Sequence, residues 1–225
     1  MKKSILLIGG SSDIGKNFIR FSKFKENYNI ISTSSKNLDL NCEKSISNFI
    51  KKNNKTNINH ILFLSAFNEI RNFKKLKNYE IKKAFNINFL GFITVLNNLI
   101  KTNKKLESII IISSLYGIYG RKGRFLYSTS KHLLNGMIKT LCMDLSKDKI
   151  RVNGLTPGFI KTKMTSKNLN NMDIKKIKSK TPIGRLGKCK EITDVLDFLI
   201  SKESSFINGQ NLIVDGGFSS GGFFE

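Results

Sequence analysis

Residues 5–15 have the sequence Ile-Leu-Leu-Ile-Gly-Gly-Ser-Ser-Asp-Ile-Gly, in which a run of apolar residues meets a turn of glycine and serine. A helical pattern of apolar residues begins directly afterwards. Glycine lets the backbone turn tightly and approach a diphosphate closely, and the N-terminus of a helix offers unpaired N–H groups and a positive dipole end. Gly9 and Gly15 suit this role best. The stretch therefore predicts the phosphate-binding corner of an α/β fold.

The rest of the chain repeats this alternation of short apolar runs and longer segments of helical period. The alternation is typical of a parallel sheet with helices on both faces, that is, a doubly wound α/β fold. We expect strands near 4–9, 28–33, 59–65, 107–113, 149–155 and 211–214, and helices near 14–24, 43–52, 76–103 (broken), 126–146 and 189–201. With 225 residues and no linker or repeat, we expect a single domain over residues 1–225.

A lysine-rich stretch between the two prolines, Pro157 and Pro182, interrupts the pattern. It lacks strand periodicity and follows the fifth predicted strand, whose carboxyl end should border a ligand crevice. We predict that residues 159–181, approximately, form a small lid over the site.

The composition excludes several classes of protein. Hydrophobic residues make up 40% of the chain, enough for a buried core. No apolar run approaches the roughly 20 residues that a membrane span needs. Cys42, Cys142 and Cys189 are an odd, widely spaced set without a Cys-x-x-Cys motif, and only two histidines occur. We therefore predict a cytoplasmic protein with no disulfide framework, no metal site and no membrane partner.

The charge needs a separate interpretation. Lys and Arg total 39 against 16 acidic residues, a formal net charge of +23, which is typical of nucleic-acid partners. Only six of the 39 are arginine, and an AT-rich genome supplies Lys, Asn and Ile in excess. Because the basic residues form no sustained block, we predict no nucleic-acid function.

A tyrosine and a lysine are spaced one helical turn apart in Tyr127-Ser128-Thr129-Ser130-Lys131. Residues at i and i+4 share a helix face, where an ammonium favours the phenolate form and lowers a tyrosine pKa toward the working range. A surface pair on an amphipathic helix would have the same spacing. The buried-strand pattern ending in Ser113-Ser114 and the phosphate-type turn favour a catalytic site instead.

In these motifs and several others the sequence resembles the short-chain dehydrogenase/reductase family, over nearly the whole chain. Within the family it is most similar to the 3-oxoacyl-[acyl-carrier-protein] reductase-like branch. The resemblance implies a single Rossmann-type domain. The matching segments, in order, are Gly9–Gly15, Ile87–Gly91, Ser113-Ser114, Tyr127–Lys131, Val152–Gly158 with Thr162, Arg185–Gly187, Asn208–Gln210 and Val214–Gly217.

The resemblance implies a role for each site residue. Tyr127 would donate the proton to a ketone oxygen and Ser114 would hydrogen-bond that oxygen. Lys131 would lower the pKa of Tyr127 and bind the nicotinamide ribose, and Asn88 would hold a water of a proton relay. The implied cofactor-binding residues are Gly9, Ser11, Ser12, Asp13, Ile14, Gly15, Ser34, Ser35, Lys36, Asp39, Leu40, Ala66, Tyr127, Lys131, Pro157, Gly158, Ile160 and Thr162.

The sequence departs from the family pattern at four places. Ile8 and Asp13 replace the usual Thr and middle Gly of the turn, and Asp13 should point away from a diphosphate as the N-cap of the first helix. Phe67 stands where a small residue is usual and should crowd the adenosine side. The segment after the second strand is short, so that the usual third helix is cut down or missing.

Cofactor and assembly follow from the same comparison. The end of the second strand has Ser34-Ser35-Lys36 and no acid, which favours the 2′-phosphate of NADP, with NAD as the alternative. A homotetramer is implied, built on helices 85–103 and 126–146 and on the C-terminal strand and tail, where Phe223 and Phe224 would suit an interface.

We expect the reaction to be the reduction of a ketone to a secondary alcohol, on a 3-oxoacyl-carrier-type or other anionic substrate. The anionic substrate is inferred from the many lysines near the expected entrance, and codon bias is the alternative explanation for those lysines. One alternative is a keto-sugar or nucleotide-sugar intermediate of surface polysaccharide biosynthesis, and another is a non-catalytic nucleotide-sensing protein, which would need no Tyr127 or Lys131. The cations expected around the entrance are Lys161, Lys163, Lys167, Lys175, Lys176, Lys178, Lys180, Lys104, Lys105, Arg121, Lys122 and Arg124.

Overall fold

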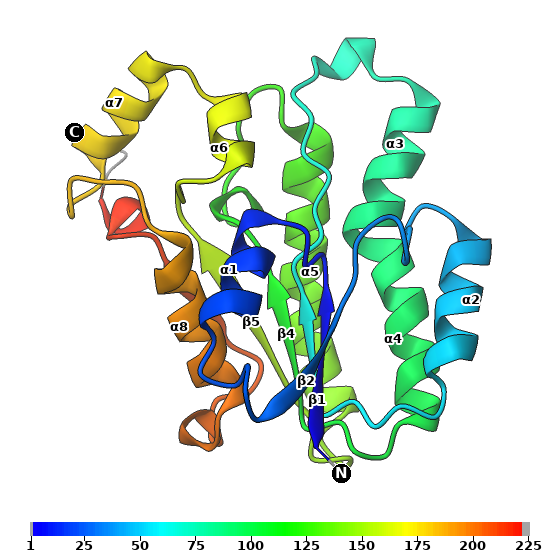
Figure 1. Cartoon of the computed structure of the whole chain (residues 1–225). Coiled ribbons are helices and arrows are strands. Elements are labelled where there is room, and N and C mark those ends of the chain that lie inside the picture. Colours follow the sequence, from blue (N-terminus) through cyan, green and yellow to red (C-terminus); the bar gives the residue numbers. More distant parts are fainter. Residues whose placement is uncertain (1, 222–225) are drawn as a thin grey trace.

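The sheet of the computed structural model, which describes residues 2–221, has six parallel strands in the order β2-β1-β3-β4-β5-β6. This confirms the predicted α/β class and all six expected strands. Their carboxyl ends point to one edge, at the top of Figure 1. The strands are β1 (Lys3–Ile8), β2 (Tyr28–Ser32), β3 (His60–Phe63), β4 (Ser108–Ile112), β5 (Arg151–Pro157) and β6 (Asn211–Val214).

Apolar residues on both faces of the strands explain the two helical layers. Leu6 and Ile61 belong to one buried cluster, and the neighbouring Ile5 and Leu62 belong to another. Because successive side chains of a strand point to opposite faces, such continuous apolar runs need a cover on each side. The first cover is α2 (Glu43–Asn53), α4 (Gly91–Thr102) and α5 (Phe125–Asp144), and the second is α1 (Asp13–Phe21) and α8 (Cys189–Ile200) (Figure 1).

The broken helix predicted over 76–103 is three pieces in the structure. These are α3 (Asn78–Phe85), a π-helical turn at Asn86–Leu90, and α4. A π turn inside a helix shifts the side-chain register by one residue and frequently marks a functional site. Asn88 lies in this turn and is fully buried.

The segment after β2 is short, as expected. Residues 33–42 connect β2 directly to α2, and β2 is the outermost strand of the described sheet. Leu38 and Leu40 are buried and fix the segment to the core on the α4 side.

The predicted lid contains two helices, α6 (Lys163–Asn168) and α7 (Asn171–Lys180). The side chains of Thr162 and Asn170 accept hydrogen bonds from the first turns of these helices, and the Asp173 carboxylate completes a capping box with Asn170. Leu169 and Ile177 pack against Leu115 and Phe218 in a separate apolar cluster. The lid is therefore an ordered element at the carboxyl edge of the sheet (Figure 1).

Residues 2–221 contain neither a membrane-spanning helix nor a cluster of metal-ligating side chains. None of the helices there has the combined length and apolar character of a membrane span. No group of three or more His, Cys, Asp or Glu side chains in that range is placed to hold a metal ion. Phe223 and Phe224, expected at a subunit interface, lie outside the described residues.

Candidate active site

A cavity of about 390 Å³ opens at the carboxyl ends of the strands, between the β1–α1 turn and the start of the lid. It brings together most of the residues implied by the family resemblance. The lining residues that the sequence predicted are Ser11, Ser12, Asp13, Ile14, Ala66, Ser114, Tyr127, Lys131, Pro157, Gly158, Ile160 and Thr162. Lys163, expected as a cation at the entrance, also lines the cavity, and the lining residues that were not predicted are Lys16, Leu64, Ile112, Ser113, Met164 and Thr165.

The β1–α1 turn has the shape that a diphosphate needs. Gly9 has φ +91°, and a Cβ there would lie 2.7 Å from the backbone nitrogen of Ser65. A Cβ at Gly15 would lie 2.6 Å from the Cα of Gly10, so that only glycine allows α1 to begin this close to the turn. Both positions shape the cavity, although neither lines it.

The backbone of the turn offers free donors to the cavity. The N–H groups of Ser11, Asp13 and Ile14 have no acceptor within the described part of the chain, and all three residues line the cavity. Unpaired N–H groups at the positive end of a helix are what a dinucleotide diphosphate requires. These residues therefore fit the cofactor that the resemblance implies.

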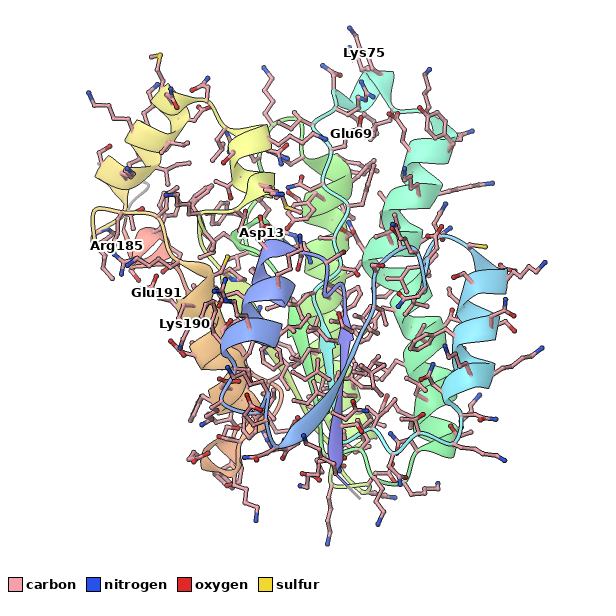
Figure 2. The ribbon with its side chains drawn as sticks, viewed as in Figure 1. Asp13, Glu69, Lys75, Arg185, Lys190 and Glu191 are labelled. Carbon is pink, nitrogen blue, oxygen red and sulfur yellow. The ribbon has the colours of Figure 1, made fainter. Side chains whose placement is uncertain are left out.

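The role predicted for Asp13 is wrong in one respect. The N-cap of α1 is Ser12, whose hydroxyl accepts a hydrogen bond from the Gly15 N–H at 3.0 Å. The Asp13 carboxylate instead accepts from the backbone N–H of Lys163, the first residue of α6, at 2.6 Å. Figure 2 shows Asp13 at the start of α1, facing the lid. The acid thus binds the turn to the lid.

The residues predicted around the adenosine do not line the cavity. Ser34, Ser35 and Lys36 follow the carboxyl end of β2, and Ser35 and Lys36 are exposed. The Asp39 carboxylate accepts from the Asn41 N–H at 2.9 Å. Leu40 is buried in the core, so its side chain is structural.

Tyr127 and Ser114 meet at the floor of the cavity. Tyr127 lies in the first turn of α5 and is 7% exposed, and Ser114 follows β4. Burial raises the pKa of Tyr127, whereas a hydrogen bond from Ser114 and the charge of Arg124 oppose this shift. Tyr127 therefore stays a phenol at neutral pH, which is the form that can donate a proton.

Lys131 is almost completely buried one turn further along α5. Its ammonium donates to the carbonyl of Ile112 at 2.7 Å and lies 5.6 Å from the centroid of the Tyr127 ring. Burial lowers the pKa of Lys131 to about 7. The groups that oppose the raised pKa of Tyr127 are Ser114 and Arg124 and do not include Lys131, so the lowering of the Tyr127 pKa by Lys131 stays a prediction.

Asn88 fixes the loop that follows β3. Its carboxamide pairs with the backbone N–H and C=O of Phe67 at 2.6 and 2.9 Å and donates to the Ser130 hydroxyl at 2.9 Å. The Ser130 hydroxyl donates to the carbonyl of Tyr127. The Phe67 ring lies 5.0 Å from the Lys83 ammonium and does not line the cavity.

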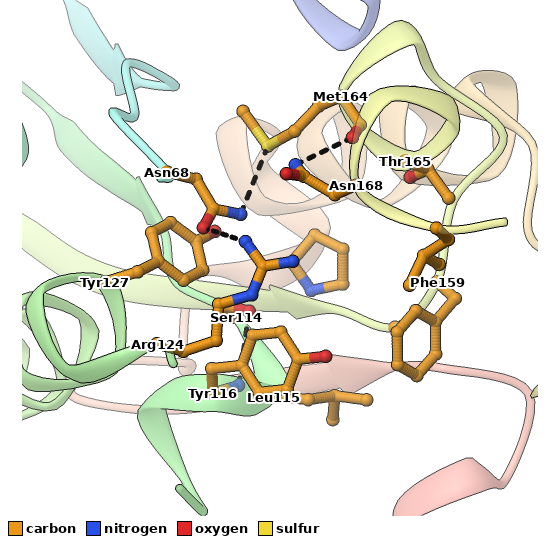
Figure 3. Close-up of a pocket in the computed structure, with 13 residues that line it drawn as sticks. Asn68, Ser114, Leu115, Tyr116, Arg124, Tyr127, Phe159, Met164, Thr165 and Asn168 are labelled. Atoms are coloured by element: carbon orange, nitrogen blue, oxygen red, sulfur yellow. Dashed lines mark hydrogen bonds between the residues drawn. The ribbon is translucent and has the colours of Figure 1, made fainter. Parts of the chain in front are cut away.

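A second, smaller pocket of about 100 Å³ adjoins the cavity (Figure 3). Ser114, Tyr127, Pro157, Gly158, Met164 and Thr165 line both spaces. The sequence did not indicate Asn68, Tyr116 or Phe159, which also line the pocket, because each comes from a different loop. Of the cations expected around the entrance, only Arg124 lines this pocket. Lys104 and Lys105 precede β4 and lie at the opposite edge of the sheet.

A sheet of this order with a phosphate-type turn, a Ser-ended strand and a buried Tyr–Lys pair defines a class of dinucleotide-binding α/β proteins. A family model described as enoyl-(acyl carrier protein) reductase matches residues 22–219. The chain belongs to the short-chain dehydrogenase/reductase family.

Curated and solved relatives agree with this assignment. The chain is 31% identical to carbonyl reductase family member 4 of Xenopus laevis, over 96% of this chain and 98% of that one. It is 37% identical over 145 residues to the 3-oxoacyl-[acyl-carrier-protein] reductase FabG of Thermotoga maritima, 64% of this chain and 58% of that one. A solved 4-hydroxyisoleucine dehydrogenase complexed with NADH is 26% identical, with a TM-score of 0.90 over 97% and 99% of the two chains.

The lengths of the matches differ between relatives. The chain spans 38% to 59% of the length of three curated relatives that it matches, a tropinone reductase homologue of Arabidopsis thaliana and the FabG proteins of Thermotoga maritima and Buchnera aphidicola.

Proposed function

We propose that the chain is an NAD(P)H-dependent oxidoreductase that reduces a ketone of an anionic substrate to a secondary alcohol. The observation that carries this proposal is the position of Tyr127 and Ser114, which line both the larger cavity with its phosphate-type turn and the smaller pocket beside it. A ketone in the smaller pocket would meet both hydroxyls.

The residues of the chain would supply the proton and hold the ketone. The Tyr127 hydroxyl would donate its proton to the ketone oxygen, and the Ser114 hydroxyl, which hydrogen-bonds Tyr127 in the structure, would hydrogen-bond the same ketone oxygen; the Ser114 oxygen also accepts from the Tyr116 N–H at 3.2 Å. Lys131, with a pKa of about 7, is partly an ammonium at neutral pH and stabilises the phenolate that remains. A bound nicotinamide supplies the hydride that the carbonyl carbon takes up and is oxidised in the step.

The remaining predicted residues would hold the cofactor. The free N–H groups of Ser11, Asp13 and Ile14 suit the diphosphate. At the end of β5 and just beyond it, the residues that suit the nicotinamide amide are Pro157, Gly158, Ile160 and Thr162. Lys131 would also reach the nicotinamide ribose. The substrate is then a 3-oxoacyl-carrier-type or another anionic ketone, in agreement with the names of the FabG relatives.

The direct test is the oxidation of NADPH, followed by its absorbance, with a panel of neutral and anionic ketones. Reduction of keto-sugars or nucleotide sugars alone would support the alternative place in surface polysaccharide synthesis. Cofactor binding by calorimetry, with no turnover of any ketone, would instead support a nucleotide sensor. The presence of Asn88, Ser114, Tyr127 and Lys131 together favours the enzyme, because a sensor needs no proton donor.

We expect the chain to prefer NADPH over NADH. Ser34, Ser35 and Lys36 place hydroxyls and a cation at the carboxyl end of β2, and the acid that follows, Asp39, is engaged by the Asn41 N–H. A 2′-phosphate would be attracted there, whereas the paired ribose hydroxyls of NADH would find no carboxylate. The measurement is kcat/KM for each cofactor at a fixed ketone concentration. A higher value with NADH would contradict the assignment.

We expect a homotetramer at micromolar concentration. The surface of α5 exposes Leu133 and Met143, and β6 exposes Ile213, on the helices and strand that the resemblance assigns to subunit contacts. Burial of these side chains between subunits would remove apolar area from water. Multi-angle light scattering gives the mass directly, and a mass of 25.5 kDa, that of one chain, would refute the assembly.

The remaining parts of the proposal concern context. We infer that residues 1–225 form one NAD(P)-binding domain, since one sheet organises the described chain. We also infer cytoplasmic function without nucleic-acid or membrane partners, which the free Cys42, Cys142 and Cys189 support.

A further inference from the structure

The smaller pocket contains a cation that no acid neutralises. Arg124 is only 3% exposed and lines the pocket together with Tyr127 and Ser114. Figure 3 shows its guanidinium pointing into the pocket between the rings of Tyr127 and Tyr116. The guanidinium donates to the amide oxygen of Asn68 and lies 5.9 Å from the centroid of the Tyr116 ring.

Within the described residues, no carboxylate lies within 4.0 Å of Arg124. Arg71 and Arg185 pair with carboxylates, whereas Arg20, Arg121 and Arg151, like Arg124, have no carboxylate within 4.0 Å among the described residues. Arg71 contacts Glu69 and Glu80, and Arg185 binds Glu191 through both of its terminal nitrogens, as Figure 2 shows beside α8. A guanidinium has five N–H donors and stays charged in proteins, so burial without an anion is unfavourable. An anion carried by a ligand would supply the charged partner that Arg124 lacks among the described residues.

A second arginine adds to the positive potential of the pocket. The Arg121 guanidinium donates to the Tyr116 hydroxyl at 2.6 Å and also lies 5.9 Å from that ring. The Tyr116 ring is therefore held between two cations. Both arginines stand at the N-terminal end of the 20-residue helix α5, where the helix dipole also favours a negative group.

The position of Arg124 relative to Tyr127 limits the shape of the anion. Arg124 is the N-cap of α5, Tyr127 lies in the first turn of that helix, and both side chains line the smaller pocket. The charge of Arg124 is close enough to favour the phenolate form of Tyr127. A ligand whose ketone oxygen meets Tyr127 would reach Arg124 with a group only a few bonds from the carbonyl carbon.

We propose that Arg124 binds a carboxylate carried by the ketone substrate itself, which makes the substrate class a small oxo acid. The planar guanidinium matches the two oxygens of a carboxylate. A pocket of about 100 Å³, with Leu115, Phe159 and Leu169 among its walls, suits a short apolar chain between the ketone and the anion and leaves no space for a nucleotide. This inference rests on the proposed ketone reduction.

The exposed lysines of the lid do not explain a preference for a carboxylate within the smaller pocket. Of the lid lysines, Lys163 alone lines the cavity, and none lines the smaller pocket. Lysines at the surface would attract any anion at a distance, and salt would screen that attraction, whereas a buried pair is screened much less. Ionic strength therefore separates the two effects.

The test uses matched pairs of substrates with the full chain and NADPH. The oxo acids 3-oxobutanoate, 4-oxopentanoate and 5-oxohexanoate are each compared with their methyl esters, and the N-acetylcysteamine thioester of 3-oxobutanoate represents the carrier-bound substrate. We expect at least one acid to exceed its ester and the thioester by about 10-fold or more in kcat/KM, at both low and high salt.

The variants locate the effect. Arg124→Gln should lower kcat/KM for that acid by at least about 30-fold, mainly through KM, and should leave the ester within about three-fold. Lys122→Gln removes an exposed charge two residues away and should leave the selectivity unchanged. If Arg124→Gln does not fold, which NADPH binding would show, Arg124→Lys replaces it with a smaller expected loss for the acid.

Each outcome decides the proposal. Equal kcat/KM for acid and ester, a preference that vanishes in high salt, or an equal loss on both substrates in Arg124→Gln would overturn it.

If no ketone is reduced, the proposed function fails, and the role of Arg124 is then decided by binding. Stabilisation of the NADP-bound chain against heat by pentanoate but not by pentanamide, lost in Arg124→Gln, would support the carboxylate site, and equal shifts would overturn it.

Discussion

Replacement of Tyr127 by phenylalanine is expected to lower kcat for ketone reduction by at least about 100-fold, the low end of the loss for a removed general acid. Among the described residues that line both spaces of the site, Tyr127 has the most acidic side chain. The ring itself would remain in the first turn of α5, 6.2 Å from the Tyr116 ring, so that the fold and cofactor binding should be unchanged.

A matched variant makes this result specific. Tyr79→Phe makes the same change on α3 at a side chain that is 62% exposed, and it should leave kcat unchanged. Cofactor binding by calorimetry reports whether Tyr127→Phe keeps the site intact. Turnover of Tyr127→Phe within a few-fold of the unmodified chain would remove Tyr127 from the mechanism.

Replacement of Lys131 by methionine is expected to abolish turnover and to stabilise the fold. Lys131 is 1% exposed, and burial lowers its pKa from 10.5 to about 7. Such a shift corresponds to as much as about 5 kcal/mol of unfavourable burial, at 1.36 kcal/mol per pKa unit. Loss of the hydrogen bond to Ile112 would offset about 1–3 kcal/mol of the gain. A net gain of about 2–4 kcal/mol in unfolding free energy at neutral pH follows.

The sign of the pH dependence is fixed by the same shift. Below about pH 7 both the folded and the unfolded chain carry the Lys131 proton, and the folded state bears the full cost of the buried charge. Between about pH 7 and 10.5 the unfolded chain binds more protons at Lys131 than the folded chain does. The unfolding free energy of the chain with Lys131 therefore rises with pH across this window. The advantage of Lys131→Met should therefore shrink across this window.

Urea unfolding of both chains at pH 6, 8 and 10 measures this difference. Lys139→Met, an exposed position on the same helix, is the control and should show no such trend. A stability gain that is independent of pH, or a loss at every pH, would show that the burial of the Lys131 charge is not the cause.

Most of the fold followed from the sequence because a parallel sheet is buried on both faces. Runs such as Ile109–Ile112 then have no alternation that could be confused with a surface strand, and the six strands lie where the apolar runs are. The two lid helices were missed because they bury little. Their signal was in the caps, Thr162 before α6 and Asn170 with Asp173 before α7.

The site was predictable where its residues are neighbours in sequence. The spacing of Tyr127 and Lys131 and the glycines of the turn place each group locally. The conformation of Phe67 was not, because the Asn88 carboxamide, 21 residues away, holds its backbone. Nor could the sequence show that Arg124 is buried, since Asn68 and Tyr116 close over it from other loops.

The hydrogen bond from the Lys163 N–H to the Asp13 carboxylate makes the phosphate-binding turn and the lid thermodynamically reciprocal. If a bound diphosphate repels the Asp13 carboxylate and weakens this contact by some factor, then breaking the contact strengthens diphosphate binding by the same factor. On that condition, the contact between Asp13 and the first residue of α6 would oppose diphosphate binding. A chain with glycine in place of Asp13 would lose both this opposition and the coupling between the turn and the lid.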